Sequence, residues 1–122
     1  MKLSRLLAEY NAAKGPVRIG LIGAGKFGSM ILAQAKHIKG YHIVGVADLD
    51  ISKAKASFAR VHWAAEAYDA PTLSDAYKTG KTCITDDAQA LMEFDGIDCV
   101  IEATGHPIAG IRHALAAIEA GK

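Results

Sequence analysis

A glycine-rich turn near the start of the chain constrains its fold more than any other feature. Residues 23–28 read GAGKFG and match the pattern GxGxxG. The turn follows the apolar run 17–22 and opens the segment 26–37, in which apolar residues recur at helical spacing. A strand, this glycine turn and a helix, in that order, are the context in which the pattern binds the pyrophosphate of a dinucleotide.

Each glycine of the turn has its own expected role. Gly23 permits a tight turn, Gly25 leaves room for a pyrophosphate beside the backbone, and Gly28 lets the helix pack closely on the sheet. The free N–H groups at the helix N-terminus would then hold the phosphate charge. The same residues nearly spell the phosphate loop GxxxxGK of nucleoside triphosphatases, but Phe27 stands where Ser or Thr must hold Mg²⁺. A methyltransferase is less favoured, because Ile22 stands where an acidic residue usually precedes the turn.

An acidic residue after the second apolar run completes the dinucleotide pattern. Asp48 lies about 20 residues after Gly28, where the pattern places a carboxylate that accepts hydrogen bonds from the adenosine ribose. The alternative is an aspartate that only caps the following helix. A carboxylate here favours NAD, since it would repel the 2′-phosphate of NADP, and Leu49 stands where an arginine would indicate NADP. Lys53 and Lys55 are near enough in sequence to approach a 2′-phosphate, although a solvated helix face also explains both.

Short apolar runs alternate with alanine-rich segments of helical spacing, which predicts parallel β-α-β units. We expect an α/β fold: a Rossmann-type parallel sheet of at least four strands in the order 3-2-1-4, flanked by helices and preceded by an N-terminal helix. The expected strands are 17–22, 42–47, 82–84 and 98–103. Residues 1–16 would form the N-terminal helix and a linker, and residues 17–122 the dinucleotide-binding domain.

The helices carry more detailed expectations. The stripe of the N-terminal helix is Leu3, Leu6, Leu7 and Tyr10, and that of the helix 26–37 is Phe27, Met30, Ile31 and Ala35. The expected N-caps are Ser4, Asp50 or Ser52, Ser74, and Asp86 or Asp87. Phe58 and Trp63 are expected in the core rather than against an adenine ring.

A second candidate site follows the fourth expected strand. This strand lies beside the first in the 3-2-1-4 order, at the crevice where such sheets bind ligands. Thr104 and Gly105 could contact the nicotinamide ribose, and His106 could act as an acid, a base or, as we favour, the cap of the next helix. Glu102 would be either a buried carboxylate with a shifted pKa or, more simply, a group that faces the loop. The remaining histidines have no metal-ligand spacing and are expected at the surface or beside strands: His37, His42, His62 and His113.

Composition excludes several classes of protein. The 122 residues are one domain's worth of chain, and a hydrophobic share of 51% excludes a disordered chain. Fourteen basic and thirteen acidic residues leave a net charge of +1, which offers no surface for nucleic acid or an anionic membrane. No apolar run is long enough to cross a membrane. Cys83 and Cys99 have no CxxC spacing, so we expect a reducing, cytoplasmic environment and no metal site.

Four segments carry a family resemblance: VRIGLIGAGKFGSM, HIVGVADLD, TDDAQAL and DCVIEATGHPIAGIRHALAAIEAGK. They resemble the N-terminal domain of the homoserine dehydrogenase-like oxidoreductases, in particular the subgroup with a C-terminal SAF domain. That subgroup includes the 1-deoxy-D-xylulose 5-phosphate reductoisomerase-like enzymes, which make an isoprenoid precursor with NADPH. The resemblance implies cofactor contacts at Gly23, Gly25, Lys26, Phe27, Gly28, Asp48 and Thr104.

The resemblance also implies that the catalytic and substrate residues belong to a later domain. We therefore expect the chain to be part of a longer NAD(P)H-dependent oxidoreductase that acts on a small molecule and forms a homo-oligomer. A full dinucleotide fold has six strands, and four are expected here, so a fifth would pair with 98–103. The alternative is a non-catalytic module that senses a dinucleotide and regulates a partner.

Overall fold

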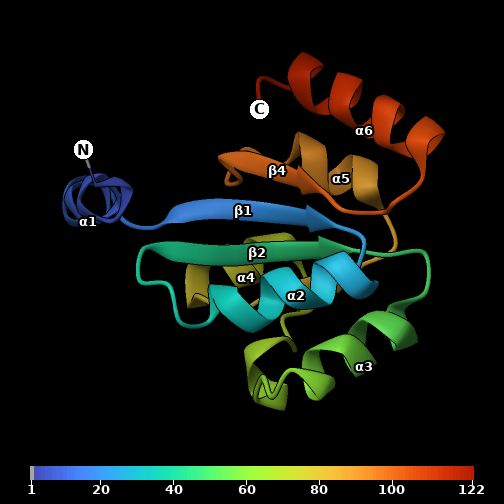
Figure 1. Ribbon diagram of the computed structural model, residues 1–122, viewed down its shortest axis with the longest axis horizontal. Helices are drawn as coiled ribbons and strands as arrows, with labels where there is room; N and C mark the ends of the chain where they lie inside the picture. The colour runs from blue at the N-terminus through green and yellow to red at the C-terminus, as the bar shows by residue number, and fades with distance from the viewer. Residues whose placement is uncertain (1) are drawn as a thin grey trace.

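A four-stranded parallel sheet forms the centre of the structure, a computed structural model that describes residues 2–122 (Figure 1). Its strands are β1 (Val17–Ile22), β2 (Tyr41–Ala47), β3 (Cys83–Thr85) and β4 (Cys99–Glu102). They lie in the order β3-β2-β1-β4, and every neighbouring pair is parallel. The predicted Rossmann-type order 3-2-1-4 is therefore confirmed.

Six α-helices connect and flank these strands within the described part of the chain. They are α1 (Leu3–Lys14), α2 (Lys26–Ala35), α3 (Ile51–Arg60), α4 (Leu73–Thr79), α5 (Ala88–Glu93) and α6 (Pro107–Glu119), with a short 3-10 helix at Ala65–Ala67. The predicted N-terminal helix is thus present, although the start of the predicted segment, residue 1, lies outside the described residues. No helix within residues 2–122 is long and apolar enough to cross a membrane.

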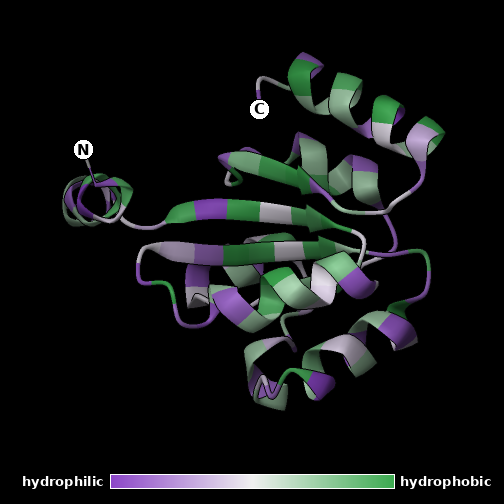
Figure 2. Cartoon of the chain, viewed as in Figure 1, coloured by the Kyte–Doolittle hydropathy of each residue, from purple (hydrophilic) through white to green (hydrophobic). Residues whose placement is uncertain are grey.

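Each face of the sheet buries its own apolar layer. One layer joins the strands to α2 and α3, where Leu32 and Phe58 are fully buried. The other joins them to α4, α5 and α6, where Leu91 and Met92 are buried. In Figure 1, α2 lies below β2 and in front of α4, and Figure 2 shows the apolar colouring along the strands. Phe58 therefore lies in the core, as predicted. The Trp63 ring packs edge-on against it, with 5.1 Å between the two ring centroids.

The central strand pair, β1 and β2, contains a bulge. The register between β1 and β2 shifts after Ile19, so that Gly20 pairs with Gly45. A Cβ at Gly20 would overlap the Leu91 side chain, and one at Gly45 would stand 2.6 Å from a methyl group of Leu73. The paired glycines therefore let α4 and α5 pack closely on the middle of the sheet.

The predicted inward face of α2 is wrong at two positions. Phe27 and Met30 are 62% and 52% exposed, whereas the adjacent positions Gly28 and Leu32 are buried. The helix begins at Lys26, directly after the glycine turn, and Gly28 must touch that turn. This contact sets the rotation of the helix and turns Phe27 and Met30 away from the sheet.

The predicted caps are correct for two helices and wrong for two. Asp50 caps α3 by accepting from the N–H of Lys53 at 3.1 Å, and Asp87 caps α5 by accepting from the N–H of Ala90 at 3.0 Å. Ser4 and Ser74 are not caps: each lies inside its helix.

Thr72 is the N-cap of α4 in place of Ser74. Its hydroxyl oxygen accepts from the N–H of Asp75 at 3.0 Å and donates to the Asp75 carboxylate at 2.9 Å. The acidic residue three positions after Thr72 makes this reciprocal pair of hydrogen bonds possible, whereas the residue three positions after Ser74 is a tyrosine.

The apolar stripe predicted for α1 packs little against the rest of the protein, because Leu3, Leu6 and Tyr10 are exposed.

Thr72→Ala should lower the free energy of unfolding by about 1 kcal/mol, the usual cost of losing a side-chain N-cap. Ser74→Ala is the matched control, since Ser74 lies within the same helix and makes no capping bond. Urea denaturation followed by circular dichroism measures both. Equal stabilities for the two variants would contradict the assignment of the cap to Thr72.

Candidate functional site

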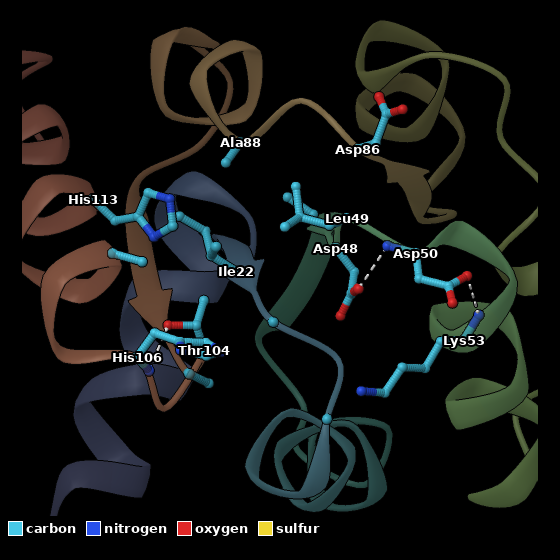
Figure 3. A pocket seen from close by; sticks show the side chains of 15 residues that line it. Ile22, Asp48, Leu49, Asp50, Lys53, Asp86, Ala88, Thr104, His106 and His113 are labelled. Carbon is cyan, nitrogen blue, oxygen red and sulfur yellow. Dashed lines mark hydrogen bonds between the residues drawn. The ribbon is translucent and has the colours of Figure 1, made fainter.

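An open crevice of about 480 Å³ lies at the carboxyl ends of β1, β2 and β4 (Figure 3). It is lined by residues of the glycine turn, of the loop after β2, of the turn after β4 and of α6. In open parallel sheets, ligands bind outside the carboxyl ends of the strands, where the connections diverge to opposite faces. Four predicted site residues line the crevice: Gly23, Gly25, Asp48 and Thr104.

Two glycines of the turn are required by the packing of the chain itself. Gly23 has φ +97°, and a Cβ there would stand 2.9 Å from the backbone of Ala103 and Thr104. Its N–H donates to the carbonyl of Ala47 at 2.8 Å. A Cβ at Gly28 would overlap the Gly23 carbonyl, so the helix can approach the turn only with glycine at this position.

The middle glycine is different, because nothing in the protein requires it. Gly25 has a negative φ of −78°, outside the left-handed region that favours glycine, and a Cβ there would meet no atom within 4 Å in the described chain apart from its two neighbours in sequence. The N–H groups of residues 25–27 donate no hydrogen bond within residues 2–122. Unused donors beside open space form an anion-binding cradle at the start of α2. A pyrophosphate bound in this cradle would lie close to the backbone, which would account for a glycine at position 25.

The other residues predicted in this turn have a narrower role. The side chains of Lys26 and Phe27 do not line the crevice, and Phe27 is largely exposed. Their backbone N–H groups, however, belong to the cradle. Gly28 is a packing residue behind it. A cofactor contact at Lys26, Phe27 and Gly28 therefore stays a prediction, and the contact would be made by backbone atoms rather than by side chains.

Asp48 links the turn to the loop after β2. Its Oδ2 accepts from the N–H of Ala24 and its Oδ1 from the N–H of Asp50, both at 2.9 Å. The cap of α3 is Asp50, so the alternative in which Asp48 only caps that helix does not hold. A carboxylate has about four acceptor sites, so Asp48 can still accept from ribose hydroxyls in the crevice.

Charges around Asp48 bear on the choice between NAD and NADP. Asp50 and Asp86 also line the crevice, and Lys53 is its single lysine or arginine among the described residues. Lys55 lies instead beside a separate hollow between α3 and the 65–71 segment. Leu49 is 94% exposed. The Asp48 side of the crevice is therefore mainly acidic.

The opposite wall of the crevice is built by the turn after β4. Glu102 accepts from the N–H of Thr104 at 2.8 Å and from its hydroxyl at 3.1 Å. The Glu102 carboxylate thus faces the loop, which was the simpler of its two predicted states. His106 is the N-cap residue of α6, as predicted, although its side chain makes no capping bond; the residue also lines the crevice. Gly105, with φ +74°, is exposed in this turn and does not line the crevice.

His113 is the residue that sequence reasoning missed. It was expected at the surface or beside a strand, with no role in the site, yet it is half-buried and lines the crevice. The spacing in the sequence could have predicted this position. His106, Ala109 and His113 lie at i, i+3 and i+7, on one face of a helix that begins beside the candidate turn. In the part of the chain that the structure describes, no three His, Cys, Asp or Glu side chains gather as metal ligands would.

Neither cysteine supplies a nucleophile to the crevice. Cys83 and Cys99 are free thiols away from it. Burial raises the pKa of the Cys83 thiol, and the charge of Asp75 adds to the effect. Burial likewise raises the pKa of Cys99, with a smaller contribution from Asp98. Both side chains therefore stay protonated at neutral pH and act as apolar groups.

Comparisons with known proteins agree with this geometry. Residues 17–122 match the model of a family described as an oxidoreductase family with an NAD-binding Rossmann fold (GFO/IDH/MocA). A similar solved structure is the myo-inositol dehydrogenase from Lactobacillus casei in complex with NAD(H) and myo-inositol. Its TM-score is 0.63 and its sequence identity 21%, over 85% of this chain and 26% of that one. At this identity the likeness shows the fold alone, and no curated protein matches the chain.

Gly25→Ala should leave the free energy of unfolding within about 0.5 kcal/mol of the wild type, because its Cβ meets open space. It should weaken NADH binding at least about tenfold, because the methyl group occupies the cradle. Gly28→Ala, the matched variant, should instead lose roughly 1–3 kcal/mol of stability through overpacking. Urea unfolding and NADH fluorescence titration measure both properties. If the Gly25→Ala protein binds NADH with the affinity of the wild type, the assignment of the cradle to the dinucleotide site is contradicted.

Proposed function

Since the chain belongs to the oxidoreductase family with an NAD-binding Rossmann fold, we propose that its crevice binds NAD(H) and orients the nicotinamide for hydride exchange with a small molecule. The observation that carries the proposal is the cradle at Gly25. Its free N–H groups and open space suit a pyrophosphate, and the packing of the chain gives no other reason for a glycine there.

The remaining contacts of the dinucleotide follow from that anchor. With the pyrophosphate at the start of α2, the adenosine ribose lies toward Asp48 at the end of β2. The nicotinamide half then extends toward Thr104 and the turn after β4. NAD supplies the hydride chemistry, and the residues of this chain hold and orient it.

Charge supports NAD over NADP. A 2′-phosphate on the adenosine ribose would meet the carboxylates of Asp48 and Asp50, with Lys53 as the compensating cation. Asp48 is also held in place by two backbone N–H groups, so it cannot easily turn away. We therefore propose that the chain prefers NAD(H).

The substrate is proposed to bind to a further domain. The chain spans 26% of the length of the inositol dehydrogenase that it resembles. β4 pairs with β1 alone among the described strands, and α6 exposes an apolar stripe: Ile108, Ile111, Leu115 and Ile118. Both surfaces suit further elements of a longer, homo-oligomeric enzyme. The motifs around Glu102 and α6 support, as the finer proposal, an enzyme like the SAF-domain homoserine dehydrogenases and their reductoisomerase-like members. Those reductoisomerase-like members use NADPH, whereas the carboxylates beside the crevice support NAD(H) for this chain.

Titration of the wild-type chain with NADH, followed by nicotinamide fluorescence, tests the proposed function directly. We expect saturable binding that NAD⁺ and ADP-ribose displace, because both carry the pyrophosphate and the adenosine ribose. ATP with Mg²⁺ is the control ligand, since position 27 lacks the hydroxyl that a triphosphate site requires. Tight binding of ATP without binding of NADH would contradict the proposal.

Asp48→Ala should weaken NADH binding by about 1–3 kcal/mol, the scale of hydrogen bonds to a charged group. NADPH binding should weaken less or improve, because the repulsion of the 2′-phosphate disappears. The ratio of the two affinities is the decisive quantity, since loss of the Ala24 and Asp50 hydrogen bonds alone would weaken both ligands equally. If the ratio of NADH to NADPH affinity is unchanged, Asp48 only holds the loop through its backbone hydrogen bonds and does not select the cofactor.

A further inference from the structure

The crevice wall opposite Asp48 is built from three separate elements. Thr104 comes from the turn after β4, His113 from the second turn of α6, and Figure 3 shows both on the side away from Asp48 and Lys53. Glu102, the last residue of β4, lies between them. Its carboxylate accepts both hydrogen bonds that Thr104 can donate, from the backbone and from the hydroxyl.

The same carboxylate also faces the imidazole of His113. Glu102 Oε1 lies 3.7 Å from His113 Nδ1, and the two side chains are 20% and 23% exposed. That nitrogen is buried and makes no hydrogen bond with any residue in the described range 2–122. Glu102 is therefore close to both crevice-lining side chains, Thr104 and His113.

The helix is adapted to this carboxylate. Gly110 lies inside α6, where glycine costs about 1 kcal/mol relative to alanine. A Cβ at that position would stand 3.2 Å from Glu102 Oε2. A glycine in the first turn of α6 thus leaves the room in which the Glu102 carboxylate lies between the turn after β4 and α6.

We propose that Glu102, paired with His113, is a positioning residue for the nicotinamide half of NAD(H). This inference rests on the proposed function, which places the ADP-ribose half of the dinucleotide on the Asp48 side of the crevice and the nicotinamide half beside Thr104. Both oxygens of Glu102 are committed to Thr104, so the carboxylate acts through its neighbours. It fixes the Thr104 hydroxyl by a hydrogen bond and lies beside the His113 ring, and these two side chains form the wall that would face the nicotinamide.

Two ligands separate this role from a general effect on binding or folding. NADH carries both halves of the dinucleotide, whereas ADP-ribose lacks the nicotinamide. Glu102→Gln puts an amide NH₂ group where Thr104 needs an acceptor, and His113→Gln removes the ring. Each variant should bind NADH about tenfold more weakly. Glu102→Gln loses a hydrogen bond of Thr104 to an ionised group, and His113→Gln loses the ring that lines the crevice. Each should bind ADP-ribose within about twofold of the wild type.

The measurement is calorimetric titration with ADP-ribose and fluorescence titration with NADH, in which the enhancement of bound NADH emission reports the surroundings of the nicotinamide. Glu119→Gln and His37→Gln are the matched controls, because both residues are exposed and lie outside the crevice. They should bind both ligands as the wild type does. Thermal unfolding identifies any variant that fails to fold, and if Glu102→Gln fails, His113→Gln decides.

The outcomes distinguish the two proposals. A wild-type chain that binds neither NADH nor ADP-ribose contradicts the proposed function itself. If the wild type binds both and the folded variants bind NADH equally well, the inference is overturned and the proposed function stands. Equal weakening of NADH and ADP-ribose also overturns the inference, because it reveals a purely structural role.

Discussion

The structure depends on one close contact, the approach of the glycine turn to its two neighbouring strands. At Gly23 the chain leaves β1, donates a hydrogen bond to the last residue of β2 and passes within van der Waals contact of the turn after β4. No side chain fits there. This contact brings together the ends of three strands, and the crevice opens directly above it. The same turn then aims the N-terminus of α2, with its unused N–H groups, into that crevice. The binding cradle is thus a direct consequence of how the sheet is closed at its centre.

The sequence predicts this central part of the structure well, because it depends on local rules. The spacing of Gly23, Gly25 and Gly28 and the alternation of apolar runs follow from backbone geometry, and the strand order is the usual one of the dinucleotide-binding fold. Gly25 has the most direct functional meaning of the three, since it alone has no structural justification. Asp48 was placed correctly at the crevice, but its two hydrogen bonds to backbone N–H groups depend on distances between loops that no pattern encodes.

The errors occur where tertiary contacts override local patterns. Apolar periodicity placed Phe27 and Met30 inside, but the contact of Gly28 with the turn fixes the rotation of α2. His113 looked like a surface residue because the direction of α6 relative to β4 is set by packing. The subgroup resemblance has a different status: the family match establishes an NAD-binding oxidoreductase domain, and the homoserine dehydrogenase-like assignment stays a proposal.

The central claim is that a dinucleotide lies across the ends of β1, β2 and β4 with its pyrophosphate on the first turn of α2. Backbone amide chemical shifts of the ¹⁵N-labelled chain, recorded during titration with NAD⁺, test it most directly. The account predicts that the largest shifts belong to the amides of residues 25–27, with further shifts at Asp48 and Thr104 on opposite sides of the crevice. Shifts confined to other parts of the chain, or none at saturating NAD⁺, would contradict it.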